Sequence, residues 1–443
     1  MQFLTGVNEK ETMELPQLWE GGHEGETVRL NGAVHTIRDM GDVAFVVLRK
    51  RDGLIQTVYE SGVTEFDLKD LHEGTCVEVE GIVHDEPRAS NGIEVRLLHV
   101  TVLSQPTEPM PLPIGKWKMK TSLEAKLNYR PISLRNVRER AKFRLQEGMV
   151  RGFREFLHTQ GFTEIHTPKL GAKSAEGGAN LFKLEYFHKP AVLQQSPQFY
   201  KQMMVGVFDR VFETGPVFRA EKHNTKRHLN EYISLDYEMG YIDSFEDIMA
   251  MEVGFLQYTM HLLQTEYARE VKMLNVEIPD VSQIPVVRFD DAKQQAAEKY
   301  NRPFRNPFDL EPEEEQLICK YYKEACGSDF VFVTHYPSKK RPFYAMDDPA
   351  DPAYTLSFDL LFRGVEVTTG GQRIHTYPML KEKMDARGME EEGMEQYLST
   401  FKHGMPPHGG AGIGLERMMM QLLRVENVRE VSLFPRDLSR LTP

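Results

Sequence analysis

The sequence is poor in cysteine and in long apolar runs. Cys76, Cys319 and Cys326 are the three cysteines among 443 residues, and their wide spacing excludes a disulfide framework or a zinc site built on cysteine pairs. We therefore expect a reducing compartment, the cytoplasm. No run approaches the roughly 18 uncharged apolar residues that span a bilayer. The first residues also lack the basic flank and apolar stretch of a signal peptide, so we expect no membrane association.

Positive charge is also in short supply. The 54 Lys and Arg against 66 Asp and Glu give a net charge of −12, which disfavours binding of nucleic acid by overall charge. It does not exclude RNA, because a local basic face can bind a large RNA while the remainder stays acidic. The apolar content of 40% is that of an ordinary globular protein, and the length predicts two or three domains.

Residues 27–104 contain five runs of alternating β-branched residues, separated by turns that contain glycine. Between the third and the fourth run, "TEFDLKDLHEG" predicts a short helix. This order is that of an OB-fold β-barrel, which commonly binds oligonucleotides, although a purely structural barrel has the same pattern. Four prolines within residues 104–116 then predict a linker. We therefore expect an N-terminal domain over 1–105 and a hinge over 106–135.

Residues 136–443 show strands with peripheral helices, an α+β pattern. A capping-box pattern at Asn136 precedes an apolar stripe at helical spacing, and Gly161 ends the predicted helix. The next run, "FTEIHTPKL", predicts a strand that Pro168 ends. Further strands, "TLSFDLLFRG" and "VEVTTGG", lead to "HGGAGIGLER", which we interpret as a glycine-rich helix entry. Residues 270–345 predict two helices and a strand without an evident role.

The most densely charged stretch, "FRAEKHNTKRHLNEY", lies between two apolar runs. Arg219 and Glu221 are two positions apart in an extended segment, so both side chains leave the same face. After this loop, "SLDYEMG" alternates a serine and two acids with apolar residues, and "RGVEVTTGGQR" repeats a polar alternation further on. Taken singly, each pattern is explained by a strand with one face in water or by a structural glycine turn.

Together, in this order, the patterns resemble the signature motifs of the class II aminoacyl-tRNA synthetases. "FTEIHTP" resembles motif 1, "FRAE…RHLNEYISLD" motif 2 and "GIGLER" motif 3. An OB-fold ahead of such a core is the arrangement of the subclass for aspartate, asparagine and lysine. The stretches "AEGGANLF", "QSPQFYKQ", "RGVEVTTGGQR" and "LFPRDLSRLTP" are similar to aspartyl-tRNA synthetases of the archaeal and eukaryotic type.

The resemblance implies an OB-fold anticodon-binding barrel followed by a catalytic domain with an antiparallel sheet. It also implies the ATP-dependent attachment of L-aspartate to tRNA through an aspartyl-adenylate, with ATP and Mg²⁺ as cofactors. Motif 1 of the family builds a two-fold interface, so a homodimer is expected.

Site residues follow from the same resemblance. The expected catalytic residues are Arg219, Glu366 and Arg417. Oxygen ligands for Mg²⁺ are expected from Glu366 and Thr369. The aspartate site is expected to contain Glu176, Ser196, Gln198, Lys201, Arg219, Thr369 and Arg373, with Lys201 and Arg373 on the β-carboxylate. The ATP site is expected to contain Arg219, Glu221, Arg227, His228, Leu229, Tyr232, Glu366, Gly414, Leu415, Glu416 and Arg417. The anticodon is expected to meet His35, Arg38, Phe45, Gln56 and Ser90.

The breadth of tRNA recognition depends on His35 and Ser90. Strict enzymes of the archaeal type tend to carry tryptophan at the place of His35 and lysine near Ser90, which predicts that tRNA(Asn) is charged as well as tRNA(Asp). The alternative is that His35 lies on a barrel strand without touching RNA and the enzyme is strict. An asparaginyl enzyme is disfavoured because Lys201 suits a carboxylate. A synthetase-like RNA-binding protein without activity is disfavoured because Arg219 and the other catalytic residues are present.

Overall fold

The computed structural model describes the chain except residues 1–2, 4–5, 8–9, 176–179, 223–224 and 304. The chain divides into two compact units, Met1–Arg140 and Ala141–Pro443. Each unit has an apolar core of its own.

The first unit contains a closed five-stranded barrel with the strand order β1-β2-β3-β5-β4. Its strands alternate buried and partly exposed residues, as in β2, where Val46 and Leu48 point into the core. The barrel confirms the predicted OB-fold, although the predicted helix after the third strand is only a 3₁₀ turn, η1. The elements of this unit are α1 Leu15–Trp19, β1 Thr27–Asp39, β2 Val43–Arg49, β3 Leu54–Glu60, η1 Leu68–Asp70, β4 Cys76–Asp85, η2 Ser90–Gly92, β5 Ile93–Ser104, α2 Leu123–Asn128 and α3 Arg130–Ser133.

An eight-stranded sheet organises the second unit, in the order β12-β13-β16-β17-β18-β11-β10-β6. The six central strands are antiparallel, and the edge strands β12 and β6 run parallel to their neighbours. The strands are β6 Thr163–Glu164, β10 Arg210–Phe218, β11 Glu231–Gly240, β12 Val286–Arg288, β13 Phe330–Thr334, β16 Ser357–Phe362, β17 Val365–Arg373 and β18 His408–Gly414. Two small sheets, β7-β9-β8 and β14-β15, comprise β7 Leu170–Gly171, β8 Lys183–Tyr186, β9 Lys189–Leu193, β14 Asp347–Asp348 and β15 Asp351–Thr355.

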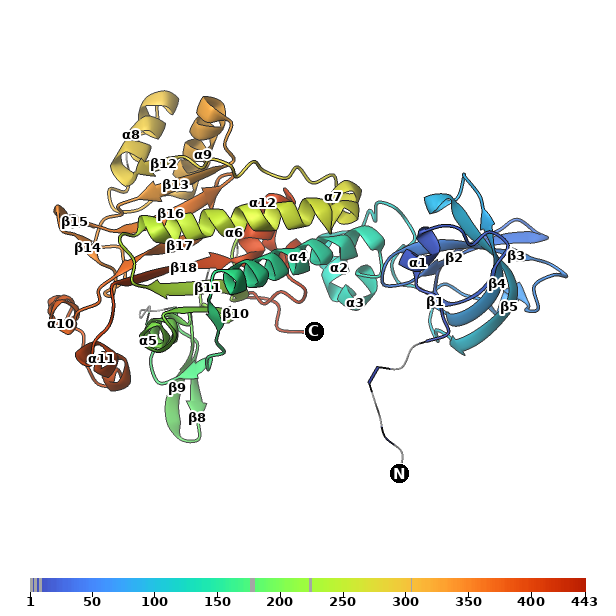
Figure 1. The fold of residues 1–443 in the computed structure, drawn as a ribbon, viewed down its shortest axis with the longest axis horizontal. Helices are drawn as coiled ribbons and strands as arrows, with labels where there is room; N and C mark the ends of the chain where they lie inside the picture. The colour runs from blue at the N-terminus through green and yellow to red at the C-terminus, as the bar shows by residue number, and fades with distance from the viewer. Residues whose placement is uncertain (1–2, 4–5, 8–9, 176–179, 223–224, 304) are drawn as a thin grey trace. The chain divides into compact units, whose positions relative to one another are not determined.

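Three helices, α4, α6 and α12, form one apolar core with the sheet (Figure 1). The side chain of Asn136 accepts hydrogen bonds from the first amides of α4, and Gly161 follows the helix with a φ of 76°, as predicted. In the apolar stripe of α4, Leu145 and Phe153 are fully buried within this core, and Phe156 is partly buried against it. The remaining helices of the unit lie around the sheet. The helices are α4 Val137–Thr159, α5 Gln198–Phe208, α6 Glu246–Thr265, α7 Ala268–Leu274, α8 Phe289–Tyr300, α9 Pro312–Cys326, α10 Tyr377–Ala386, α11 Glu395–Lys402, α12 Leu415–Leu422 and η3 Val428–Val431.

Two expected elements differ from the structure. The run "FTEIHTPKL" forms only the two-residue strand β6 before the chain leaves the sheet, because β6 pairs with β10 only at Thr163 and Glu164. The glycine-rich run from His408 to Gly414 is a central strand, β18, and the helix begins only at Leu415. A Cβ on Gly410 would lie 2.1 Å from a carboxylate oxygen of Glu238, so the glycines make room for acid side chains of β11.

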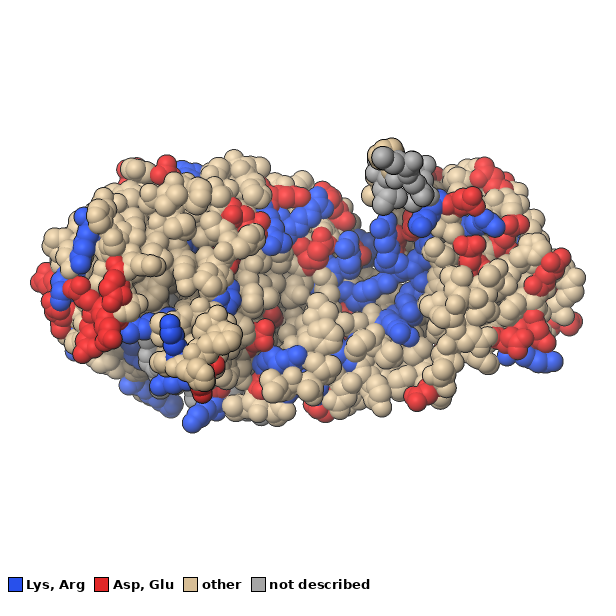
Figure 2. Space-filling view, turned by 90° about the horizontal axis from the view of Figure 1, so that it is seen from below, with Lys and Arg blue, Asp and Glu red and all other residues tan. Residues whose placement is uncertain are grey.

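Several general expectations can be compared with the molecule. No helix in the described part of the chain combines the length and the apolar character that a membrane crossing requires. Cys76, Cys319 and Cys326 are free thiols. Acidic and basic side chains are interspersed over much of the face drawn in Figure 2, so the negative net charge is not one continuous acidic surface on that side.

Candidate active site

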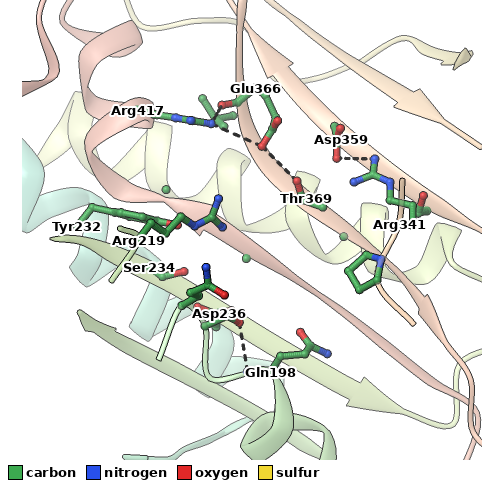
Figure 3. A pocket seen from close by; sticks show the side chains of 18 of the residues that line it. Gln198, Arg219, Tyr232, Ser234, Asp236, Arg341, Asp359, Glu366, Thr369 and Arg417 are labelled. Carbon is green, nitrogen blue, oxygen red and sulfur yellow. Dashed lines mark hydrogen bonds and ion pairs between the residues drawn. The ribbon is translucent and has the colours of Figure 1, made fainter. Parts of the chain in front are cut away.

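A cavity of about 330 Å³ lies on the second unit's sheet, against β11, β17 and β18. Its walls come from segments far apart in the sequence: the start of α5, the β10–β11 loop, the loop after β13 and the start of α12. Figure 3 shows their polar side chains directed toward one another across this space. The antiparallel order places these segments together because β17, β18 and β11 are direct neighbours.

One end of the cavity holds a buried lysine. The ammonium group of Lys201, on α5, lies 3.1 Å from Asp236 Oδ1 and 3.3 Å from Glu238 Oε2, and donates to the carbonyl oxygen of Ala411 at 3.0 Å. Its side chain is only 2% exposed. An ammonium group has three protons, and three protein acceptors surround this one. Lys201 is therefore fixed in position.

A second cation, Arg373, joins the same network. Its Nε donates to Glu238 at 2.9 Å, and its Nη2 donates to the carbonyl oxygen of Gly410 at 2.9 Å. Burial raises the pKa of Glu238, but Arg373 and Lys201 outweigh burial, so that its pKa is lowered and the carboxylate is ionised. His408 adds no charge, because burial lowers the pKa of its imidazole to about 4. Two cations and two carboxylates thus converge here. This combination suits a ligand that carries both positively and negatively charged groups.

The charged loop between β10 and β11 forms another wall. The two ends of the loop are held together, because Arg219 N donates to Asn230 O at 2.8 Å and Asn230 Nδ2 donates to Arg219 O at 2.8 Å. The guanidinium carbon of Arg219 lies 5.7 Å from the ring centroid of Tyr232, and Figure 3 shows the two side chains next to each other. The side chain of Arg219 is 41% exposed, so this cation faces the open cavity.

A chain of polar contacts crosses the opposite wall. Arg417 Nη1 donates to the carbonyl oxygen of Glu366 at 3.2 Å and lies 3.6 Å from its carboxylate, while Thr369 Oγ1 donates to Glu366 Oε1 at 3.2 Å. Beside them, Arg341 Nη2 donates to Asp359 Oδ1 at 2.8 Å (Figure 3). Burial raises the pKa of Asp359, the nearby Glu366 raises it further, and Arg341 opposes the rise.

These oxygens are the donors that a magnesium ion requires. Two carboxylates, Glu366 and Asp359, and the hydroxyl of Thr369 line one cavity, and Mg²⁺ prefers such hard ligands while keeping waters or phosphate oxygens in its other positions. No group of three or more His, Cys, Asp or Glu side chains placed to hold a metal occurs among the described residues.

Two family models match the chain. Residues 122–438 match the tRNA synthetases class II (D, K and N), and residues 28–103 match the OB-fold nucleic acid binding domain. The chain belongs to the class II tRNA synthetases for D, K and N. The stretches that resemble motifs 2 and 3 form the β10–β11 hairpin and the β18–α12 segment described above.

Individual relatives agree with this assignment over almost the whole chain. The chain is 48% identical to an aspartate--tRNA(Asp/Asn) ligase of Deinococcus radiodurans, with 98% of each sequence covered, and 40% identical to an aspartate--tRNA(Asp) ligase of Pyrococcus furiosus, with 95% and 97% covered. Among solved structures, asparaginyl-tRNA synthetase from Pyrococcus horikoshii, complexed with asparaginyl-adenylate, matches with a TM-score of 0.87 at 31% identity, over 95% of this chain and 97% of that one.

Most site residues expected for this class II synthetase line the one cavity. These are Ser196, Gln198, Lys201, Arg219, Glu221, Arg227, His228, Leu229, Tyr232, Glu366, Thr369, Arg373, Gly414, Glu416 and Arg417. Leu415 instead lies in the apolar core, 2% exposed, so its side chain cannot line an ATP site and only its backbone is available. Glu416 is buried, and its carboxylate accepts from the backbone amide of Ile233. Glu176 lies outside the described residues.

Sequence reasoning missed three acids and a cation of the site. Asp236 and Glu238 had a usable signal, since both alternate with apolar residues on β11, but no role was assigned to them. Asp359 lies in "SFDLLF", which is typical of a buried strand, and nothing local marks it as a cavity residue. Arg341 comes from residues 270–345, which carried no motif.

The anticodon residues expected on the barrel do not all share one surface. Arg38 and Phe45 are paired across β1 and β2, with the guanidinium carbon 5.4 Å from the ring centroid, and the partly exposed Gln56 lies on β3. Ser90 is exposed in η2. His35, however, is 2% exposed, because it lies at an irregularity in the β1–β2 register between Val34 and Thr36.

The surroundings of His35 do not favour contact with a base. Arg49 Nη1 lies 3.5 Å from its Nδ1, and burial together with Arg49 and Arg140 lowers the pKa of the imidazole to about 4. The structure therefore does not bring His35 to the surface that contains Arg38 and Phe45. Recognition of a base by its ring would require this part of the barrel to open.

Proposed function

We propose that this class II synthetase attaches L-aspartate to both tRNA(Asp) and tRNA(Asn) through an aspartyl-adenylate. The observation that carries the choice of amino acid is the pair of buried cations, Lys201 and Arg373, at the closed end of the cavity. A negatively charged carboxylate side chain is attracted by both cations, whereas a neutral amide gains much less from them. Asp236, in the same network, is placed to accept the cationic α-amino group of the substrate.

The first step in this proposal is activation of the amino acid. An oxygen of the aspartate α-carboxylate attacks the α-phosphorus of ATP, a new P–O bond forms, and the bond to the leaving pyrophosphate breaks. Arg219 neutralises charge on the α-phosphate, and Arg417 binds the outer phosphates. Glu366 and Thr369, with Asp359 beside them, would hold Mg²⁺, which supplies charge neutralisation on the phosphates. Tyr232 provides an aromatic surface for adenine.

The second step transfers the amino acid. A hydroxyl of the tRNA 3′-terminal ribose attacks the carbonyl carbon of the adenylate, and AMP leaves as the ester forms. Phosphoryl and acyl transfer of this kind need positioning and charge stabilisation more than a dedicated base. The cavity supports this chemistry because several cationic side chains, and not a single proton-accepting side chain, face the position proposed for the phosphates.

An asparaginyl enzyme is the competing assignment, since the asparaginyl-tRNA synthetase from Pyrococcus horikoshii shares the fold. The likeness in fold does not separate the two activities, because they share one scaffold. The relatives by sequence favour aspartate, since two aspartate ligases are 48% and 40% identical to the chain over almost its whole length. The lysine at position 201 points the same way.

Relaxed tRNA specificity rests on the relatives rather than on His35. The relative from Deinococcus radiodurans, at 48% identity, is named for tRNA(Asp/Asn), and that from Pyrococcus furiosus, at 40%, for tRNA(Asp) alone. We expect kcat/KM for aspartate transfer to transcripts with GUC and GUU anticodons to agree within about tenfold, ~1.4 kcal/mol. A preference for GUC beyond ~10²-fold, ~2.7 kcal/mol, would instead make the enzyme strict for tRNA(Asp).

We also propose a homodimer, because α4 and the stretch "FTEIHTP" that follows it resemble motif 1. The apolar stripe of α4 is not available as the contact surface between two subunits, because Leu145 and Phe153 are buried in the protein's own core. Other surfaces must then form the two-fold interface. Light scattering at micromolar concentration should give twice the chain mass of 51.1 kDa, and a species of 51.1 kDa alone would contradict the dimer.

A further inference from the structure

Residues 270–345 lie outside the three motifs, yet they bring a buried carboxylate to the edge of the ATP site. This carboxylate belongs to Glu315, in the first turn of α9. Its side chain is 7% exposed. Glu313, on the same turn, is 63% exposed and lies 2.9 Å from Arg302 instead of Arg227.

One oxygen of Glu315 joins three segments of the chain. Glu315 Oε2 accepts from Arg227 Nη1 at 3.0 Å, and it also accepts from the backbone amide of Glu366 at 3.3 Å. Arg227 belongs to the β10–β11 loop and Glu366 to β17, and both line the cavity. A hydrogen bond between a guanidinium and a carboxylate is among the stronger and more directional contacts in proteins. The contact therefore fixes Arg227 relative to Glu366.

The position of α9 is set independently of this contact. The helix begins with a capping box between Glu311 and Glu314, and the carboxylate of Glu314 accepts from the buried Lys293 at 2.8 Å. Arg302 lies 2.7 Å from Glu314 Oε1. Ile318, further along α9, is fully buried in a separate apolar cluster with β13. Glu315 is thus presented by a rigid element, as a group that positions another residue must be.

We propose that Glu315 is a positioning residue of the ATP site, which holds the guanidinium of Arg227 at the cavity in the orientation that binds the nucleotide. The inference rests on the proposed function, because it takes Arg227 as an ATP-binding residue. Without a fixed partner, a long arginine side chain loses rotamer freedom each time ATP binds, so binding weakens. The opposite role is that Glu315 withdraws Arg227 from ATP, in which case its removal strengthens binding.

The test compares Glu315→Gln with the unchanged protein, and with Glu313→Gln as the matched control on the same turn. ATP binding is measured by calorimetry without amino acid or tRNA, at pH 8, above the pKa of about 7 to which burial and Glu366 raise Glu315. We expect the Kd for ATP to rise about tenfold in Glu315→Gln and to stay unchanged in Glu313→Gln. In ATP–pyrophosphate exchange, KM for ATP should rise by a similar factor while KM for aspartate stays constant.

A double-variant comparison separates positioning from general damage to the fold. If Glu315 acts through Arg227, adding Glu315→Gln to Arg227→Gln should weaken ATP binding no further. Equal or tighter ATP binding by Glu315→Gln, or a full additional loss in the double variant, would overturn the inference. If thermal melting shows that Glu315→Gln does not fold, Glu315→Asp replaces it. The shorter side chain moves the carboxylate away from Arg227 by one methylene, and the same outcomes apply.

The measurement also separates this inference from the proposed function. If the unchanged protein failed to activate aspartate but bound ATP, the choice of amino acid would be wrong, while the comparison of ATP affinities would still decide the role of Glu315.

Discussion

Replacement of Lys201 by leucine should reduce kcat/KM for aspartate in ATP–pyrophosphate exchange by ~10²-fold or more, because sites built for a charged partner reject its absence strongly. The substrate β-carboxylate would lose one of two cations. It would also be repelled by the carboxylates of Asp236 and Glu238, because the lysine that neutralises them would be missing. ATP binding, measured by calorimetry, should change little, since Arg219 and Arg417 are untouched.

The structural cost of Lys201→Leu has to be measured separately, because removing one partner of a buried ion pair destabilises proteins by about 3–5 kcal/mol. Lys169→Leu is a suitable control. Lys169 lies 2.8 Å from the buried carboxylate of Glu213 and does not line the cavity. We expect both variants to melt at lower temperature, but only Lys201→Leu to lose aspartate activation. Exchange activity within about threefold of the unchanged protein in folded Lys201→Leu, ~0.7 kcal/mol, would refute the assignment of the aspartate pocket.

The sequence was sufficient for the architecture where local pattern and tertiary structure agree. The barrel strands alternate buried and exposed residues throughout, so their period of two was visible without the structure. The helix α4 was predicted for the same reason, with its cap at Asn136 and its end at Gly161 both present. Such signals are local, and each reports on one element.

The errors come from features that only the tertiary structure determines. The glycines of β18 were interpreted as a helix entry, whereas they are required because Glu238 lies against the strand's backbone. The irregularity at His35 reverses the side-chain alternation at a single position. The residue types around it give no sequence signal that would predict it. Glu315 belongs to a run of three glutamates, which is typical of a solvated helix face until the opposing loop is known.

Most residues expected from motif-like stretches line the cavity, whereas lining residues between those stretches were not expected. Arg219, Glu366 and Arg417 lie in motif-like stretches and line one cavity. Asp359 and Arg341 act as a pair at 2.8 Å, and neither has a local signature, because they approach each other only when the loop after β13 lies over β16. Long-range pairs of this kind cannot be found from spacing in one sequence.

The second large effect is expected at Arg219, whose guanidinium faces the cavity beside Tyr232. Arg219→Gln should lower kcat for aspartate activation by ~10²–10³-fold, the range seen when one preorganised donor to a developing negative charge is removed. The fall in kcat should exceed the rise in KM for ATP, because charge on the α-phosphate is greatest in the transition state. Arg219→Lys should recover only part of the activity, since an ammonium cannot present the two parallel donors of a guanidinium.

The control for Arg219→Gln removes a charge from the same loop without removing a group that faces the cavity. Lys226 serves this purpose, because its side chain is 70% exposed and lies 3.0 Å from Glu426 outside the cavity. Lys226→Gln should keep kcat within about threefold of the unchanged protein, ~0.7 kcal/mol, which is the range expected of an exposed ion pair. Pre-steady-state measurement of adenylate formation distinguishes the outcomes for Arg219. If Arg219→Gln formed adenylate at an unchanged rate and only bound ATP more weakly, Arg219 would contribute to ground-state binding alone. Stabilisation of the phosphoryl transition state would then have to come from Arg417, on the opposite wall, and from the Mg²⁺ that we propose is held by Glu366 and Thr369.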